Sequence, residues 1–197
     1  MKALGTARLT LDPVTPRNAA ALWRVMQSPG LREFQDVPHF TRDEFAQRVA
    51  ARPRVFGART VGRFEWLVTE KKDRMPIGWV SLRVGEAMRG SAELGYSLIP
   101  AHRACGYATE AVAAVLHAGF AESTLRRIDA CCVPENLPSR RLLERLGFRQ
   151  NRVQRAGAVV HSRAVDVMVF EMTRERWNGL QSGSANSIVM PASSKPK

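Results

Sequence analysis

Apolar and polar residues alternate in several short stretches of the first half of the chain, and this period predicts strands. The first such stretch is Arg8 to Leu11. Phe64 to Glu70 and Ile77 to Val84 are rich in aromatic and β-branched residues and flank a polar turn, so they predict an antiparallel hairpin. Ser91 to Ile99 predicts a further strand that ends before Pro100.

Apolar residues spaced by three and four positions predict helices between these strands. Asn18 to Met26 has this spacing. A second helix is expected from Thr41, because Thr41 and Glu44 fit the two ends of a capping box. The spacing returns from Ala108 to about Glu122 and predicts a third helix.

The second half of the chain alternates between strand and helix signals. Ile128 to Val133 predicts a short apolar strand, and Ser139 to Leu146 predicts a helix that ends at Gly147. Val165 to Met172 predicts the last strand. A strand, a glycine turn, a helix and a strand in this order are typical of a βαβ unit within a mixed sheet.

The length of the chain bounds its organisation. Its 197 residues, 45% of them hydrophobic, suffice for one core but not for two full domains. We expect a single domain over residues 1–179 and a disordered, serine-rich tail over residues 180–197, which holds too little apolar surface to fold alone. No apolar run is long enough for a membrane span or a secretory signal, so we expect a soluble, cytoplasmic protein without a membrane partner.

Charge and cysteine content narrow the choice of ligand. The formal net charge of +12 favours an anionic ligand or assembly. Cys105, Cys131 and Cys132 lack CxxC spacing and the histidines are scattered, so no metal site is expected. Arginines concentrate between Arg126 and Arg155, but no aromatic-basic motif accompanies them, and sequence-specific nucleic-acid recognition is not expected.

One glycine turn is the first candidate for ligand chemistry. Gly106 lies between an expected strand and an expected helix, where backbone N–H groups at a helix N-terminus favour a phosphate. Gly106 allows close approach to the backbone, Arg103 can add a charged hydrogen bond, and Ala108 keeps the first helical turn small. Such a turn also occurs as plain architecture, so it does not decide the function alone.

A second motif lies downstream, where Asn136-Leu137-Pro138-Ser139 is followed by Leu146-Gly147-Phe148. Together with the turn from Arg103 to Ala108, it resembles the GNAT N-acetyltransferases. Their glycine turn reads Q/R-x-x-G-x-G/A, and their next helix reads NxxS with a closing LGF. The resemblance extends from about Thr10 to Trp177, nearly everything outside the expected tail.

The resemblance implies an α/β fold with a mixed α+β sheet, the GNAT fold. Its central sheet is mostly antiparallel, with six or seven strands, one splayed parallel pair and helices on both faces. The splayed pair would be Glu93 to Ile99 and Ile128 to Val133, with the pantetheine arm of acetyl-CoA in the gap between them. The cofactor-binding residues implied are Leu98, Ile99, Arg103, Ala104, Cys105, Gly106, Tyr107, Ala108, Asn136 and Ser139.

Acetyl transfer to an amine needs a base for the amine and an acid for the leaving thiolate. Many GNAT enzymes use a tyrosine on the NxxS helix as the acid, but this chain has Leu143 there, which makes it more similar to the RimJ/RimL-like ribosomal-protein N-terminal acetyltransferases. That branch implies Ser139 as the acid, and Glu93 is the candidate base. Glu93 can equally pair with an arginine and Ser139 can equally stabilise its helix, while Tyr96 and Tyr107 are expected in the core.

The resemblance implies an acetyl-CoA-dependent N-acetyltransferase that works by direct attack in a ternary complex. The simplest acceptor is a protein N-terminus, such as that of a ribosomal protein, and Phe34, His39 and Phe40 are expected to line its pocket. Two alternatives stay open: an acetyltransferase for a small amine such as an antibiotic or polyamine, and a non-catalytic module that senses acyl-CoA or docks on RNA. The sequence also leaves homodimerisation open.

Overall fold

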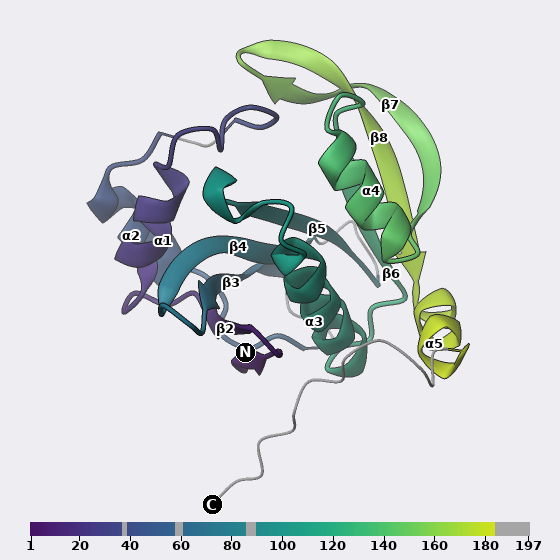
Figure 1. Ribbon diagram of the computed structural model, residues 1–197, viewed down its shortest axis with the longest axis horizontal. Coiled ribbons are helices and arrows are strands. Elements are labelled where there is room, and N and C mark those ends of the chain that lie inside the picture. The colour runs from purple at the N-terminus through teal and green to yellow at the C-terminus, as the bar shows by residue number, and fades with distance from the viewer. Residues whose placement is uncertain (37–38, 58–60, 86–89, 184–197) are drawn as a thin grey trace, which may run out of the picture.

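The computed structural model describes residues 1–36, 39–57, 61–85 and 90–183 of the chain. Its strands form one sheet in the order β1-β2-β3-β4-β5-β6-β8-β7 (Figure 1). β5 and β6 run parallel, and the other neighbouring pairs are antiparallel. The strands are β1 (Leu4–Gly5), β2 (Leu9–Pro13), β3 (Gly62–Glu70), β4 (Met75–Val84), β5 (Ser91–Leu98), β6 (Arg127–Cys132), β7 (Arg149–Val160) and β8 (Arg163–Thr173).

Helices cover both faces of this sheet, and in Figure 1 α3 and α4 lie in front of the strands. The helices are α1 (Ala19–Met26), α2 (Arg42–Ala50), the short 3-10 helix η1 (Pro100–His102), α3 (Tyr107–Ala121), α4 (Leu137–Arg145) and α5 (Arg174–Gly183). None of the helices in the described ranges is both long and apolar enough to cross a membrane.

The two faces of the sheet carry separate apolar clusters, because successive residues of a strand point to opposite faces. On one face, Leu22 of α1 and Phe45 of α2 pack with Leu67 of β3 and Trp79 of β4. The larger cluster, on the other face, joins β2 to β6 and β8 with α3, α4 and α5. β3 and β4 are therefore buried on both faces and lie between the two clusters.

Local sequence signals place the helix ends as expected. Thr41 caps α2: its hydroxyl accepts a hydrogen bond from the Glu44 backbone N–H at 3.2 Å, and the Glu44 carboxylate accepts one from the Thr41 N–H at 2.8 Å. Gly147 follows α4 with a φ of 89°, the left-handed conformation that ends many helices.

The fold class that the resemblance implied is confirmed, with eight strands in the described chain instead of six or seven. The sequence patterns did not predict β1 or β7. β7 is exposed along most of its length, and its pairing with β8 shifts register between Gln154 and Ala158, so apolar and polar residues do not alternate there.

The tail was expected to start at residue 180, a position that the structure places within α5. α5 continues to Gly183, and Leu180 packs against the main core. A Cβ atom added to Gly147 would lie 2.5 Å from a methyl carbon of Leu180, which shows how closely α5 approaches the end of α4. The rest of the expected tail, residues 184–197, lies outside the described residues.

Candidate functional site

A cleft opens where β5 and β6 separate. The two parallel strands pair only from Ser91 with Arg127 to Leu94 with Ala130, although β5 continues to Leu98. The cleft has a volume of about 830 Å³ and lies between this gap, the turn before α3, the start of α4 and residues 31–35. The expected splayed pair is confirmed.

Because side chains alternate along β5, the cleft opens on both faces of the sheet. Leu94, Tyr96 and Leu98 face the core beneath α3 and α4. Glu93 and Ser97 face the other side, where Glu93 contacts Arg83 of β4. A ligand held against α3 and a second ligand on the opposite side can therefore meet within the gap.

The turn before α3 has the geometry of an anion site. Ala104 and Gly106 both have positive φ, 61° and 80°, and Gly106 is the N-cap of α3. Glycine has no side chain to cap the helix, so N–H groups of the first turn keep hydrogen-bonding capacity beside the cleft. Ala104, Gly106 and Ala108 all line the cleft, and their contact with a cofactor stays a prediction.

Arg103 lines the cleft, but its guanidinium is bound to protein groups. It donates to the Leu98 carbonyl at 3.2 Å and to the Gly30 carbonyl at 2.9 Å, and it forms an ion pair with Glu33 at 3.2 Å. Arg103 thus fastens the loop after α1 to the end of β5. Its contact with a phosphate stays a prediction.

Three of the residues expected to bind the cofactor do not line the cleft with the others. The Ile99 backbone N–H donates to Ile77 of β4, and the exposed Cys105 thiol points back to the Arg103 carbonyl. The Tyr107 hydroxyl donates to the buried Glu70 on the core side of α3. Tyr107 is therefore half-buried and packs against the core.

Arg8, directly before β2, and Glu110 of α3 support the turn in a way that the sequence did not reveal. Arg8 donates to the Cys105 carbonyl at 2.9 Å and to the Glu110 carboxylate at 2.7 Å, and it lies over the Tyr107 ring. Burial opposes the charge of Glu110, but hydrogen bonds from Thr6 and Arg8 outweigh it and lower the pKa of this carboxyl. These contacts fix the backbone of the turn before α3.

The NxxS motif forms one end of the cleft. Asn136 is the N-cap of α4, and its side-chain oxygen accepts a hydrogen bond from the Ser139 N–H at 3.1 Å. The Ser139 hydroxyl lies 2.7 Å from the hydroxyl of Tyr96 on the facing strand. Leu143 is fully buried in the core. The sequence assigned Tyr96 to the core and did not reveal this hydroxyl pair.

Glu93 lines the cleft on the face opposite α3 and forms an ion pair with Arg83. The alternative interpretation of Glu93, a carboxylate paired with an arginine, is therefore confirmed, and its role as a base stays a prediction. Asp129 lies directly beside Glu93 in the register of β5 and β6, and burial raises the pKa of Asp129. Asp129 forms an ion pair with Arg127 at 3.0 Å, so each of these two carboxylates has an arginine partner.

Two cysteines at the end of β6 line the same gap. Burial, together with the nearby charges of Glu93 and Asp129, raises the pKa of the Cys131 thiol to about 11. Burial also raises the pKa of Cys132, whose thiol hydrogen-bonds Ser139. Both side chains are therefore protonated at neutral pH and are poor nucleophiles.

The loop after α1 forms the wall opposite α4. Phe34 lines the cleft, and the Gln35 side chain donates to the Ser97 hydroxyl at 3.0 Å. The tip of the β7–β8 hairpin meets this loop, because the His161 N–H donates to the Asp36 carboxylate at 3.0 Å. His39 contacts Arg32 instead of the cleft.

Phe40 does not line the cleft as expected, and only some of the arginines between Arg126 and Arg155 do. Phe40 packs beneath Arg48 in the cluster of α1 and α2 and does not line the cleft. Arg141 and Arg145 lie on α4 and line the cleft, while the arginines of β7 lie outside it. Val37 and Pro38, which lie between Phe34 and His39 in the chain, are outside the described residues.

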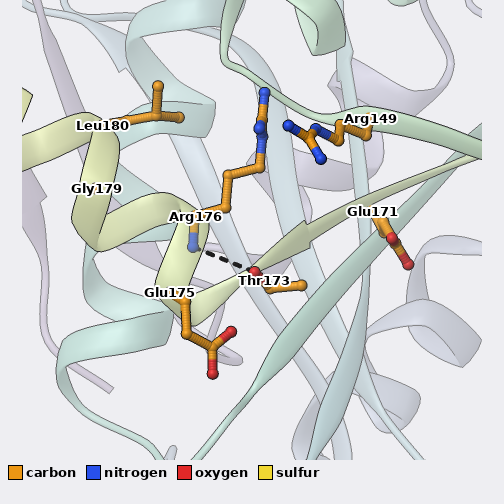
Figure 2. Close-up of a pocket in the computed structure, with 7 residues that line it drawn as sticks. All are labelled: Arg149, Glu171, Thr173, Glu175, Arg176, Gly179 and Leu180. Atoms are coloured by element: carbon orange, nitrogen blue, oxygen red, sulfur yellow. Dashed lines mark hydrogen bonds between the residues drawn. The ribbon is translucent and has the colours of Figure 1, made fainter.

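A second pocket, of about 510 Å³, lies between the start of β7, the end of β8 and α5 (Figure 2). None of its lining residues lines the cleft. The Arg176 N–H donates to the Thr173 hydroxyl at 3.2 Å, and the Arg176 guanidinium donates to the Gly147 carbonyl. These groups join α5 to its neighbours, so we regard this pocket as structural.

The chain matches the acetyltransferase (GNAT) domain over residues 8–149. Among curated proteins, the uncharacterized N-acetyltransferase p20 of Bacillus licheniformis is 29% identical over 180 residues, which cover 91% of this chain and 100% of that protein.

Solved structures share the fold. The RimL ribosomal L7/L12 alpha-N-protein acetyltransferase in complex with coenzyme A has a TM-score of 0.76 at 16% identity, covering 89% of this chain and 99% of that one. Mycobacterium smegmatis RimJ in complex with CoA-disulfide has a TM-score of 0.70 at 22% identity, covering 92% and 94%. Because the domain match spans most of the chain, including the glycine turn, this protein belongs to the GNAT family and is an acetyl-CoA-dependent N-acetyltransferase.

Proposed function

We propose that this protein acetylates the α-amino group of a protein N-terminus, by direct attack of the amine in a ternary complex. The observation that carries the proposal is the cleft that opens on both faces of the sheet at the β5–β6 gap. A donor can lie on the α3 and α4 side while a chain end approaches from the loop after α1.

The residues around the cleft fit coenzyme A. The first turn of α3, with Gly106 as its N-cap, offers N–H groups to the pyrophosphate, and a side chain at Gly106 would crowd this turn. Beyond Leu94, β5 has no β6 partner, so its edge can pair with the amides of the pantetheine arm. Arg141 and Arg145 add positive charge at the α4 side.

Acetyl-CoA supplies an activated acetyl thioester when it is bound. Glu93, which lines the cleft and forms an ion pair with Arg83, takes the proton that the amine loses. Ser139 donates a proton from Oγ to the departing sulfur, CoA leaves as its thiol, and a proton from solvent restores the Ser139 hydroxyl. The protonated thiols of Cys131 and Cys132 argue against a relay through an acetyl-cysteine.

Charge and structural neighbours favour a protein acceptor over a polyamine. A net charge of +12 repels a polycation, whereas a peptide whose N-terminus carries a single α-amine has less positive charge and is repelled less. Neighbours that share the fold are named as acetyltransferases of ribosomal proteins, among them the ribosomal-protein-S5-alanine acetyltransferase from Vibrio fischeri, with a TM-score of 0.74 at 18% identity. The cytoplasmic location and homodimerisation stay predictions.

Calorimetric titration with acetyl-CoA, followed by an assay of CoA release, tests the proposal. The assay compares peptides that have free N-termini with the same peptides after N-terminal blocking, and with polyamines. We expect binding, and release of CoA only with free N-termini. Release with blocked, lysine-containing peptides or with polyamines would contradict the N-terminal acceptor, and binding without release by any amine would indicate a sensor.

A further inference from the structure

We infer that Tyr96 is a positioning residue, which orients the Ser139 hydroxyl toward the reacting end of the cleft. This inference rests on the proposed function, because it assigns a partner to the proposed acid. The hydroxyl pair joins two elements that flank the β5–β6 gap, since Tyr96 is on β5 and Ser139 is in the first turn of α4.

The geometry favours a specific bond between the two hydroxyls. The Tyr96 oxygen lies 2.7 Å from Ser139 Oγ and 3.4 Å from the Ser139 carbonyl oxygen, so the side-chain contact is the shorter one. Both residues line the cleft. The Ser139 backbone is held separately, by the bond from its N–H to Asn136.

The two hydroxyls are not equivalent as donors. Burial raises the pKa of the Tyr96 phenol, although its bond to Ser139 acts in the opposite direction, so the phenol keeps its proton at neutral pH. A serine hydroxyl has one proton and two lone pairs. When Tyr96 donates to one lone pair of Oγ, the serine proton is left for another acceptor in the cleft.

Tyr96 places a phenol hydroxyl beside α4, which has no tyrosine of its own. The α4 position where many GNAT enzymes have a tyrosine is Leu143 here, and this leucine is fully buried in the core. Tyr96 reaches the same helix from the facing strand and contacts the hydroxyl of the NxxS motif. The Cys132 thiol approaches Ser139 as well, so Oγ lies among polar partners that restrict its rotation.

The test is Tyr96→Phe, which removes one hydroxyl and keeps the ring. We expect kcat to fall about tenfold, the size expected for one well-placed hydrogen bond, with unchanged KM for acetyl-CoA. In the Ser139→Ala background, Tyr96→Phe should lower kcat no further, because the group that it orients is absent. Circular dichroism and the melting temperature check that each variant folds.

Ser81→Ala is the matched control. Ser81 lies on β4 opposite Gly95, outside the cleft, and its hydroxyl contacts the same strand as Tyr96, so its loss should leave kcat unchanged. Unchanged kcat in Tyr96→Phe, or an equal loss with and without Ser139, would overturn the role of Tyr96 while the proposed function stands. Absence of CoA release by the unaltered protein with every free N-terminus would overturn both.

Discussion

At the scale of single residues, the left-handed backbone at Gly106 decides how a ligand can approach α3. Any L residue in this conformation strains the backbone by about 1–2 kcal/mol. A Cβ atom at Gly106 would also lie 3.3 Å from the guanidinium of Arg8, which donates to the Cys105 carbonyl of the same turn. A substitution of Gly106 both strains the backbone and blocks the approach of a ligand to α3, so a control variant must separate the two effects.

Gly106→Trp should abolish acetyl-CoA binding in calorimetry, because the indole fills the space beside the first turn of α3. Gly90→Trp is the matched control: Gly90 also has positive φ, but its neighbour is the flexible Arg126 side chain and it lies outside the cleft. Gly90→Trp should reduce the free energy of unfolding by a similar amount and leave the affinity for acetyl-CoA unchanged. Equal affinities of the two variants would remove the phosphate site from the Arg103 to Ala108 turn.

Cys131 should react slowly with iodoacetamide at pH 8 and faster as the pH rises toward about 11. Burial and the charges of Glu93 and Asp129 disfavour the thiolate, which is the reactive form. Mass spectrometry of the digested protein measures alkylation at each pH, and a model peptide with one cysteine is the control, with its reaction levelling off above about pH 8.5. A plateau at the same pH in both would contradict the raised pKa.

At the scale of elements, the N-terminal strands and α3 are joined by one carboxylate. Glu110 accepts hydrogen bonds from the Thr6 hydroxyl and from Arg8, and its pKa is lowered in the fold. Such a carboxyl stabilises the protein above the pKa that it has in the unfolded chain, and this stabilisation is lost as the pH falls through the lower pKa of the fold.

Glu110→Gln should therefore reduce the free energy of unfolding by about 1–2 kcal/mol at pH 7, the value of hydrogen bonds to a charged group. The difference from the unaltered protein should shrink below about pH 4, where the carboxyl of the unfolded chain is protonated. Urea denaturation at pH 7 and below about pH 4 measures the free energy of unfolding of both proteins. Glu144→Gln, at an exposed position, is the control. A difference that is constant with pH would show that the charge is not the cause.

Elements with a clear period were predicted well, and an element without one was missed. The ends of α2 and α4 were predicted because Thr41 and Gly147 act on their own helices. β7 was missed because it is largely exposed and its register shifts beside Ala156, which has a φ of 47°. Its assignment depends on pairing with β8, which no local pattern expresses.

At the scale of the whole molecule, the net charge of +12 should make acetyl-CoA binding depend on salt. The Kd should rise when sodium chloride increases from about 50 to about 500 mM, because ions screen the attraction to the phosphates. Arg145→Gln should weaken binding and this dependence, whereas Arg155→Gln on β7 should change both less, since only Arg145 lines the cleft. Equal effects of the two variants would show that the arginines act through net charge alone.

The sequence by itself determined the glycine turn, the NxxS helix start, the strand and helix order of the core, and through them the family. These features depend on residues that are close in the chain, where periodicity and backbone preferences are visible. Only the tertiary structure decided that Arg103 binds Glu33, that Glu93 pairs with Arg83, and that Tyr96 meets Ser139. Such contacts join residues that are distant in the chain, so they arise only when the sheet and its helices pack together.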